Sequence, residues 1–298
     1  MKIFVTGTNG FVGSYVVKQL LSDGFDVIAS SKSADLSNFQ SYKNYNFLQL
    51  DITDPFALHD AFEWAKPDVV VHCAAMSKPD DCEMNQAGAY ALNVEVTVQL
   101  LLNSAEFKSH FVHLSTDFIF NGEKGMHDEE DTPCPISYYG QTKLDAEDAV
   151  KEYEFLWTIV RTVFVFGRTL YGRDSFVGMI AKKILNNEPY KVVNDQERTP
   201  TYAPDLASGI AEIIKRRAKG VYNLCGKDVV TPFEIAVRTA RILGIKDHRL
   251  TSVNCKEFKE IAKRPLKSGL NIEKARRELD YEPLSFDDGL KNTLQFFK

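Results

Sequence analysis

The sequence predicts an α/β protein with a doubly wound parallel sheet and a smaller C-terminal α/β region. Apolar, β-rich runs alternate with helical patterns through the first half of the 298 residues, which is the order of a parallel sheet covered by helices. One run, in "PDVVVHCAA", is continuously apolar, as strands buried on both faces are. After residue 167 the helical stretches lengthen and are broken by prolines, which indicates a second region over the carboxyl edge of the sheet.

Each element has its own pattern. Strands of the large sheet are expected at residues 2–6, 25–30, 47–50, 68–72, 110–115 and 156–161, with a helix beginning at Phe11 after the first of them. The second half offers short strands at 190–193 and 220–224. Because no repeat or low-complexity linker divides the chain, we expect a domain over 1–166 packed against 167–298, with some later segments returning to the first domain.

The composition excludes several classes of protein. Its 36 basic and 41 acidic residues are interspersed and give a net charge of −5, so no positive field exists to hold a nucleic acid. No run approaches the roughly 20 apolar residues that span a bilayer, and the first residues lack signal-peptide anatomy, so we expect a cytoplasmic protein without a membrane partner. Reduced thiols and no structural zinc are expected, because the five cysteines form no CxxC pair.

Gly7, Gly10 and Gly13 stand three apart, directly after the first strand and at the head of the first helix. A backbone that turns sharply and approaches a pyrophosphate needs residues without Cβ, and the helix N-terminus adds N–H groups and a positive dipole end. Because strand, helix and parallel sheet accompany these glycines, they favour a dinucleotide site over a bare glycine-rich turn. The domain at 1–166 is therefore expected to be an NADP-binding Rossmann domain.

The end of the second strand indicates which dinucleotide binds. It reads "IASSKS", with no carboxylate before Asp35 to hold the ribose 2′-hydroxyl of NAD. Ser31 and Lys32 there favour the 2′-phosphate of NADP(H), with NAD(H) as the alternative, although Lys32 could also be a solvated loop lysine. Asp51, at the end of the third strand, is expected either at the adenine amino group or as a helix cap.

Tyr139 and Lys143 lie four residues apart in "SYYGQTKLDAEDAV", so they share one face if this stretch is helical. A free tyrosine has a pKa of about 10, and a neighbouring ammonium favours its phenolate. Such a pair is placed to protonate a carbonyl oxygen as a nicotinamide delivers hydride. Tyr138 has no lysine four residues on, so Tyr139 is the candidate acid. The alternative of a purely structural tyrosine is outweighed by the glycines that precede it.

Two adjacent hydroxyls in "HLSTDFIFNG" could bond the same carbonyl, because a buried strand ends there at the edge that faces the cofactor. Ser115 and Thr116 point to opposite faces of a strand, so only one of them can act. Their spacing does not decide which one.

Together these residues resemble an extended short-chain dehydrogenase/reductase, and within it the dTDP-4-dehydrorhamnose reductase group. The resemblance rests on "GTNGFVG", "PDVVVHCAA", "LSTDFIFNG", "YYGQTKLDAE", "NDQERTPTYAPDLA" and "KRPLKSGL", which extend over nearly the whole chain. It implies a catalytic trio of Thr116, Tyr139 and Lys143, and reduction of the C4 keto group of a nucleotide-diphospho-sugar with NADPH or NADH. The contacts expected are Gly7, Gly10, Phe11, Val12, Gly13, Ser31, Lys32, Asp51, Ile52, Ala74, Ala75, Tyr139 and Lys143 for the cofactor, and Ser77, Asp117, Phe164 and Arg264 for the substrate.

The chain departs from this group at some positions. Where the group resembles "RTSWVYG", this sequence reads "RTVFVFG", so Phe164 replaces a tryptophan beside the sugar. Ser77 lies in the loop "MSKPDDCE", where the family contacts substrate, and Arg264 is expected either at the diphosphate or in a structural ion pair. Sugar dehydratases resemble T-D-E at the strand end, whereas Phe118 follows Asp117 here, so dehydration is not expected.

Other functions remain open. An epimerase would use the same trio and return the hydride, so net NADPH consumption separates it from a reductase. The sequence is also similar to the regulatory β subunit of methionine adenosyltransferase around "VHCAA" and "YGQTKLDAE", which implies a dinucleotide-binding partner protein without turnover. A homodimer is one option for its assembly. No metal site is expected, since a solvated loop explains the acidic run "HDEEDTP" more simply than a divalent ion does.

Overall fold

The computed structural model describes residues 1–172, 174–257 and 260–297. Its centre is a seven-stranded sheet in the order β3-β2-β1-β4-β5-β6-β8, in which each neighbouring pair is parallel. The strands are β1 (Lys2–Thr6), β2 (Asp26–Ser31), β3 (Tyr45–Gln49), β4 (Val69–His72), β5 (His110–Thr116), β6 (Trp157–Thr162) and β8 (Gly220–Asn223). The predicted fold class, a doubly wound α/β sheet, is confirmed.

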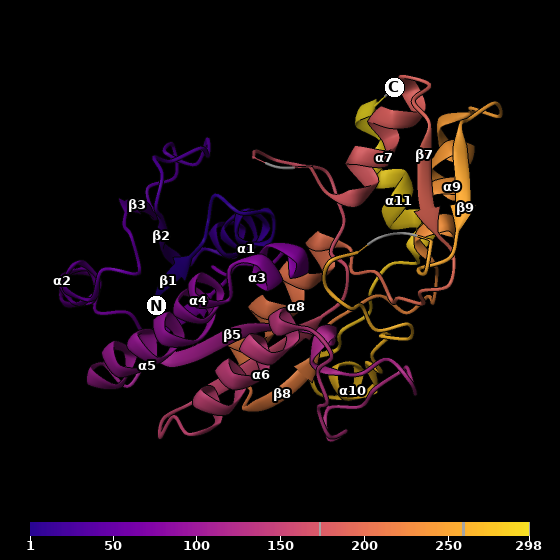
Figure 1. Ribbon diagram of the computed structural model, residues 1–298. Helices are drawn as coiled ribbons and strands as arrows, with labels where there is room; N and C mark the ends of the chain where they lie inside the picture. The colour runs from indigo at the N-terminus through magenta and orange to yellow at the C-terminus, as the bar shows by residue number, and fades with distance from the viewer. Residues whose placement is uncertain (173, 258–259, 298) are drawn as a thin grey trace.

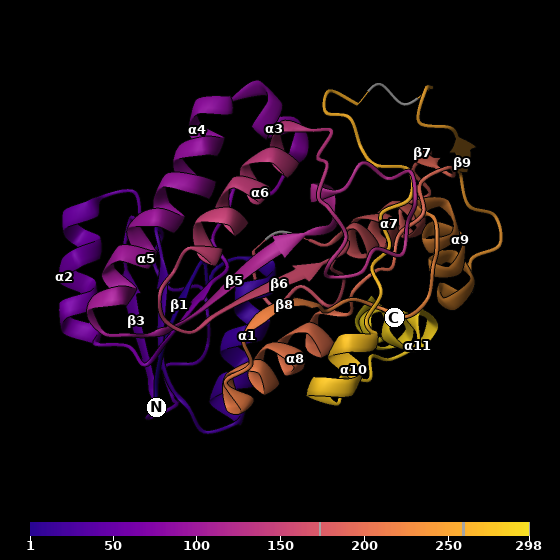
Figure 2. The same ribbon diagram turned by 90° about the horizontal axis from the view of Figure 1, so that it is seen from below.

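Helices cover both faces of this sheet (Figure 2). On one face lie α1 (Phe11–Ser22) and α8 (Ala203–Arg216), and on the other lie α2 (Pro55–Ala65), α5 (Val96–Glu106) and α6 (Tyr138–Lys151). The alternation of side chains along β1 explains the two layers, because Ile3 and Val5 join the core beneath α1 and α8 while Phe4 joins the core beneath α2 and α5.

A smaller lobe lies beyond the carboxyl edge of the sheet (Figure 1). It contains the parallel pair β7 (Tyr190–Val193) and β9 (Leu250–Val253), with α7 (Phe176–Leu185), α9 (Pro232–Leu243) and α11 (Phe286–Leu294) packed around them. The sequence pattern indicated β7 but missed β9. The remaining short elements are α3 (Pro79–Met84), α4 (Gln86–Tyr90), a π-turn (Ala91–Glu95), α10 (Glu273–Leu279) and 3₁₀ turns at Asp117–Ile119 and Gln295–Phe297.

Segments after residue 166 belong to both parts of the molecule. α8 packs against α1, and β8 pairs with β6 at the edge of the large sheet, whereas α7, α9 and α11 build the lobe. The division into a domain over 1–166 and a region over 167–298 with returning segments stays a prediction. Among the described residues, no helix has both the length and the apolar character required to cross a bilayer.

Candidate active site

The three glycines of the first turn form a tight cradle. Gly7 has φ +68°, and a Cβ added to it would lie 2.8 Å from the backbone of Ala74 at the end of β4. A Cβ on Gly13 would lie 2.3 Å from the carbonyl oxygen of Gly7, so α1 can approach the turn only with glycine there. Gly10 is the N-cap residue of α1, and no side chain caps that end. The first amides of α1 therefore face an open, electropositive position suited to a phosphate.

Beside this cradle lies the end of β2, which carries the residues expected at the 2′-phosphate. The Ser31 hydroxyl accepts a hydrogen bond from the backbone N–H of Asn9 (2.9 Å), which ties the glycine turn to β2. Lys32 is exposed and forms an ion pair with Asp51 (2.8 Å). Hydrogen bonds from Lys32 and from Thr53 lower the pKa of Asp51 to about 2. Asp51 is not the cap of α2, because Asp54 accepts the hydrogen bonds of that helix's first turn.

The first carboxylate after β2 is not free for a ribose. Asp35 accepts hydrogen bonds from the hydroxyl of Tyr45 (2.9 Å), from Gln40 (2.8 Å) and from the backbone N–H of Ser37 (2.8 Å). A side chain held in this way cannot turn toward a 2′-hydroxyl without losing these bonds. The surroundings of the β2 end therefore favour a phosphate over a bare ribose hydroxyl.

The other residues expected at the cofactor surround the same turn. Phe11 and Val12 form the start of α1 and are half-buried, with Phe11 packed against Tyr15 at 5.7 Å between ring centroids. Ala74 and Ala75 follow β4, and the backbone N–H of Ala74 donates to Thr6 at the end of β1. Ile52 is buried in the core beneath α2, so only its backbone remains for a ligand.

Helix α6 carries the tyrosine and the lysine on its buried face. Its N-cap residue Ser137 accepts the backbone N–H of Gly140 (3.2 Å). A Cβ on Gly140 would lie 2.2 Å from the carbonyl oxygen of Phe118, so this glycine lets α6 pack tightly against the end of β5. Tyr139 and Lys143 are 9% and 3% exposed, as their spacing predicts for one face of a helix.

The groups around Tyr139 change the pKa of its phenol. Burial raises its pKa above the ordinary value, the Thr116 hydroxyl opposes that change, and the negative charge of Asp117 adds to it. Its ring packs edge-on against Phe118 at 5.7 Å. The neighbouring Tyr138 lies less deeply, and its backbone N–H donates to Glu83 (2.8 Å).

The two hydroxyls at the end of β5 have different partners. Ser115 donates to the buried carboxylate of Glu147 (2.6 Å), which also binds the buried Arg161 through Oε2 (2.8 Å). Thr116 instead donates to Asp117 (3.1 Å) on the side of Tyr139. Thr116 is thus the hydroxyl that faces the candidate acid, while Ser115 holds α6 to the sheet.

Asp117 is the carboxylate that accepts from Thr116 and whose charge acts on Tyr139. It is 2% exposed, burial raises its pKa, and the positive charge of Arg198 partly offsets that rise. Arg198 is also buried, and it donates to Gln196 (3.0 Å) and to the carbonyl oxygen of Glu197 (2.8 Å). An arginine and a carboxylate therefore face each other where the sheet meets the lobe.

A cavity of about 210 Å³ opens between the edge of the sheet and the lobe. Phe164 and Arg264 line it, and their contact with a substrate stays a prediction. Most of the other lining residues are not indicated by any motif of the sequence; they include Phe118, Phe176, Tyr190, Gln196, Arg198 and Glu260. Aromatic faces suit a base or sugar ring, and guanidinium groups suit a diphosphate.

Arg264 is held by two carboxylates rather than left free. It forms ion pairs with Asp80 (3.1 Å) and Glu260 (3.3 Å). Asp80 lies in the first turn of α3, on the sheet side of the cavity, and also accepts the backbone N–H of Ala262 (3.0 Å). Arg264 therefore lines the cavity and takes part in an ion pair, and its contact with a diphosphate stays a prediction.

The loop after β4 is fixed by an asparagine on the π-turn. Asn93 accepts the backbone N–H of Met76 (2.8 Å), and its amide group donates to the Met76 carbonyl oxygen (3.1 Å) and to Thr142 on α6 (3.0 Å). Ser77 follows in this loop but is exposed and does not line the cavity, so its contact with substrate stays a prediction.

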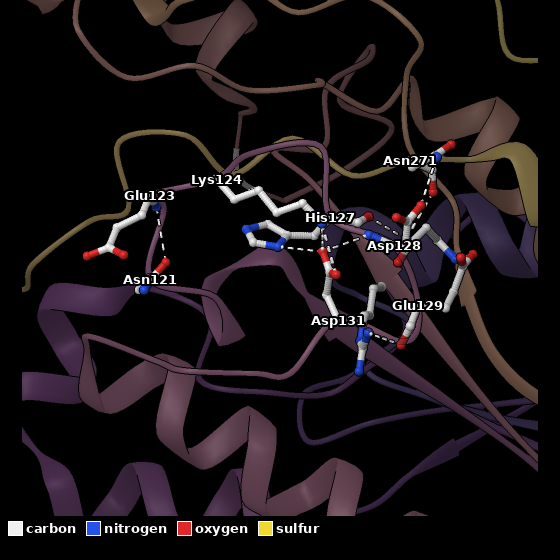
Figure 3. A network of polar contacts seen from close by, with 10 residues as sticks. Asn121, Glu123, Lys124, His127, Asp128, Glu129, Asp131 and Asn271 are labelled. Atoms are coloured by element: carbon white, nitrogen blue, oxygen red, sulfur yellow. Dashed lines mark hydrogen bonds and ion pairs between the residues drawn. The ribbon is translucent and has the colours of Figure 1, made fainter.

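The acidic run at residues 127–133 forms an internal network (Figure 3). Asp131 accepts hydrogen bonds from Lys124 (2.7 Å) and lies 3.0 Å from His127, while Asp128 accepts from Asn271 (2.8 Å). Within the described part of the chain, no group of three or more His, Cys, Asp or Glu side chains could hold a metal ion.

A family model and several known proteins match most or all of the chain. The family model described as "RmlD substrate binding domain" matches residues 1–298. The probable low-salt glycan biosynthesis reductase Agl14 of Haloferax volcanii is 29% identical over 97% of this chain and 96% of its own. A probable dTDP-4,6-dihydroxy-2-methyloxan-3-one 4-ketoreductase of Streptomyces antibioticus is 31% identical over 93% and 88%. Subunit β of methionine adenosyltransferase 2 of Rattus norvegicus is 26% identical over 85% and 75%.

Solved structures share the fold of both the sheet and the lobe. A dTDP-4-dehydrorhamnose reductase of Clostridium acetobutylicum superposes with a TM-score of 0.87 at 31% identity, over 100% of this chain and 99% of that one. The dTDP-4-dehydrorhamnose reductase of Bacillus anthracis in complex with NADP gives 0.88 at 27% identity, over 98% of each chain. A UDP-glucuronic acid 4-epimerase of Bacillus cereus in complex with UDP-glucuronic acid and NAD gives 0.87 at 27% identity, over 99% and 98%.

Proposed function

This chain belongs to the RmlD substrate-binding domain family, and on that premise we propose that it reduces the C4 keto group of a nucleotide-diphospho-sugar with NADPH. The family makes it an NAD(P)-dependent oxidoreductase. The observation that carries the proposal is the position of Tyr139 on α6 beside the Thr116 hydroxyl, with Lys143 one turn along the same buried face. Relatives named as dTDP-sugar reductases support this class of substrate.

NADPH fits the residues present. The glycine turn admits no Cβ at Gly7 or Gly13, the first turn of α1 has no side-chain cap, and Asp35 is engaged by Tyr45. Lys32 and Ser31 would hold the 2′-phosphate, in which case Lys32 exchanges its ion pair with Asp51 for a pair with the phosphate. NADPH bound there supplies the hydride. The NADP complex of a relative with a TM-score of 0.88 supports this choice over NADH.

The catalytic roles follow from the chemistry of each side chain. Tyr139 donates its phenolic proton to the carbonyl oxygen, and the ammonium of Lys143 favours the phenolate that remains. The Thr116 hydroxyl, which donates to Asp117 when no substrate is bound, donates instead to the same carbonyl oxygen. The aromatic and arginine side chains of the cavity would hold the nucleotide and its diphosphate. Residues 1–166 are proposed as the cofactor-binding domain, and 167–298 mainly as the substrate-binding region.

The experiment mixes the protein with NADPH and a freshly generated dTDP-4-keto-6-deoxy sugar and follows the absorbance of the reduced nicotinamide. We expect oxidation that falls by about 10²- to 10⁴-fold in Tyr139→Phe, since general acid catalysis contributes that much. Tyr138→Phe is the matched control and should retain its rate. Equal activity in wild type and Tyr139→Phe would refute the assignment of the acid, and bound NADPH that is never oxidised would refute the reductase.

The same experiment separates the alternatives. An epimerase would convert one sugar nucleotide into another without net loss of NADPH, as expected from the likeness to a 4-epimerase. A regulatory subunit would bind the dinucleotide without turnover and would co-purify with a synthetase, as expected from the likeness to the methionine adenosyltransferase subunit.

A further inference from the structure

The amine of Lys143 is bound by a histidine on the neighbouring strand. Lys143 is 3% exposed, and its Nζ lies 2.9 Å from Nε2 of His113 in the middle of β5. Within the described residues this is the one hydrogen bond that the amine makes, and it has no ion pair within 4.0 Å. A buried ammonium without an acceptor is costly, so this contact bears directly on the charge that Tyr139 needs.

Nε2 of His113 is suited to accept a hydrogen bond from the amine of Lys143. It is fully buried, and burial together with the nearby Lys143 and His72 keeps its pKa well below the ordinary value, so the imidazole is neutral. An ammonium can only donate, so with Lys143 charged Nε2 is the unprotonated nitrogen that accepts and Nδ1 carries the hydrogen. Nδ1 has no hydrogen-bond partner among the described residues. The imidazole therefore has no group to which it could pass a proton, and it only accepts the hydrogen bond from Lys143.

The other groups that face Lys143 do not replace this acceptor. Glu147, one turn along α6, raises the pKa of the lysine, but its oxygens bind Ser115 and Arg161. Cys73, at the end of β4, is a thiol whose pKa burial raises to about 12, so it stays neutral.

The remaining neighbours are engaged or neutral. His72 pairs with Thr6 (2.8 Å), and burial lowers its pKa to about 3. Tyr139 lies one turn before Lys143 on α6 and is protonated at rest.

We propose that His113 is a positioning residue whose Nε2 fixes the ammonium of Lys143 on the buried face of α6, one turn from Tyr139. It touches neither the reacting carbonyl nor the proton that moves, and acts through the lysine. Only the catalytic consequence rests on the proposed function, because the contact between the two side chains exists without a substrate.

The test measures the pKa of Lys143 directly. Protein labelled with ¹³C in its lysine side chains is titrated by NMR as wild type, His113→Gln and His113→Phe, and Lys143→Met identifies the resonance. The amide oxygen of glutamine can accept the same bond, so His113→Gln should keep the pKa near its wild-type value of about 8. In His113→Phe the pKa should fall by about one unit or more, as loss of a hydrogen bond to a charged group predicts.

An activity arm checks the consequence. The pH above which kcat/KM for NADPH oxidation declines should fall in His113→Phe by the same amount as the lysine pKa and stay in place in His113→Gln. In a Tyr139→Phe background, His113→Phe should cause no further loss. An unchanged lysine pKa in His113→Phe, or equal shifts in both variants, would overturn the proposal. If no keto sugar is reduced, the proposed function fails while the titration still decides the role of His113.

Discussion

At the scale of single residues, the end of β5 shows how adjacent hydroxyls are given separate tasks. Ser115 donates to the buried Glu147 of α6, whereas Thr116 lies beside Tyr139 near the start of the same helix. The spacing left this choice open, because either hydroxyl satisfies the pattern, and only the family resemblance pointed to Thr116. Only the position of α6 relative to the sheet decides it.

Two substitutions should separate these tasks. Thr116→Ala should lower kcat by about 10- to 100-fold with little change in the melting temperature, because it removes a hydrogen bond to the reacting oxygen. Ser115→Ala should lower the free energy of unfolding by about 1–3 kcal/mol, since a buried carboxylate loses a donor, and should leave kcat within a few-fold. Steady-state kinetics and thermal denaturation check both. The reverse pattern would show that Ser115 is the catalytic hydroxyl.

The pH dependence of reduction should follow Lys143. Burial lowers its pKa to about 8, so the amine is charged below that pH and neutral above it. The ammonium favours the phenolate that forms as Tyr139 gives up its proton, so kcat/KM should be highest below pH 8 and decline above it. A pH profile with saturating NADPH measures this. A profile that rises through pH 8 would contradict the proposed role of the lysine.

Tyr139 and Lys143 could be predicted from spacing because a helix face depends on local order alone. Arg198 and His113 could not. Arg198 comes from the segment before α8 and is far from Asp117 in the sequence, so no local pattern brings the two together. His113 lies in a buried strand, and it contacts Lys143 only because α6 packs over that strand. The available signal was a titratable residue inside a buried strand, three positions before Thr116.

At the scale of elements, the glycines at the start of α1 affect both the packing of the helix and the binding of the cofactor. Gly13→Ala places a Cβ 2.3 Å from the carbonyl oxygen of Gly7, so the helix must move away from the turn. We expect the dissociation constant for NADPH to rise by at least about 10-fold, since the phosphate bonds depend on the first amides of α1. Gly24→Ala, after the other end of α1, meets open space but has φ +81°, so it should cost about 1 kcal/mol of stability and leave NADPH binding unchanged.

Fluorescence titration with NADPH and thermal denaturation distinguish the two variants. An unchanged dissociation constant in Gly13→Ala would show that the cradle is not the phosphate site.

Most strands could be located from composition because buried parallel strands are continuous apolar runs. β4 and β5 are such strands, buried on nearly every residue. β9 was missed because it is short and half-exposed, with one fully buried residue, Val253. Its pairing with β7 joins segments 60 residues apart, as in the register Val193↔Val253, which no local pattern reveals.

At the scale of the whole molecule, the ion pair between Asp80 and Arg264 joins the sheet side of the cavity to the segment that follows β9. A diphosphate that binds Arg264 must compete with Asp80 and Glu260. Arg264→Gln should therefore raise KM for the nucleotide sugar by about 10-fold or more, whereas Asp80→Asn should leave KM unchanged or lower it.

Both variants should lose only small amounts of stability, because the pairs they break are part-exposed, and Arg264→Gln also loses the pair with Glu260. Kinetics at fixed NADPH together with thermal denaturation measure this. Equal increases in KM in the two variants would mean that the pair only shapes the cavity and that Arg264 does not contact substrate.

The arrangement of the smaller lobe also has a consequence for its synthesis. Phe286, Leu290 and Leu294 of α11 complete a core with Phe166 and Val177, which leave the ribosome far earlier. Until α11 has emerged from the ribosome, this core lacks three of its apolar side chains and cannot close. During translation the large sheet can therefore assemble before the lobe and its side of the cavity. The nascent chain becomes competent for substrate only after α11 has joined the lobe.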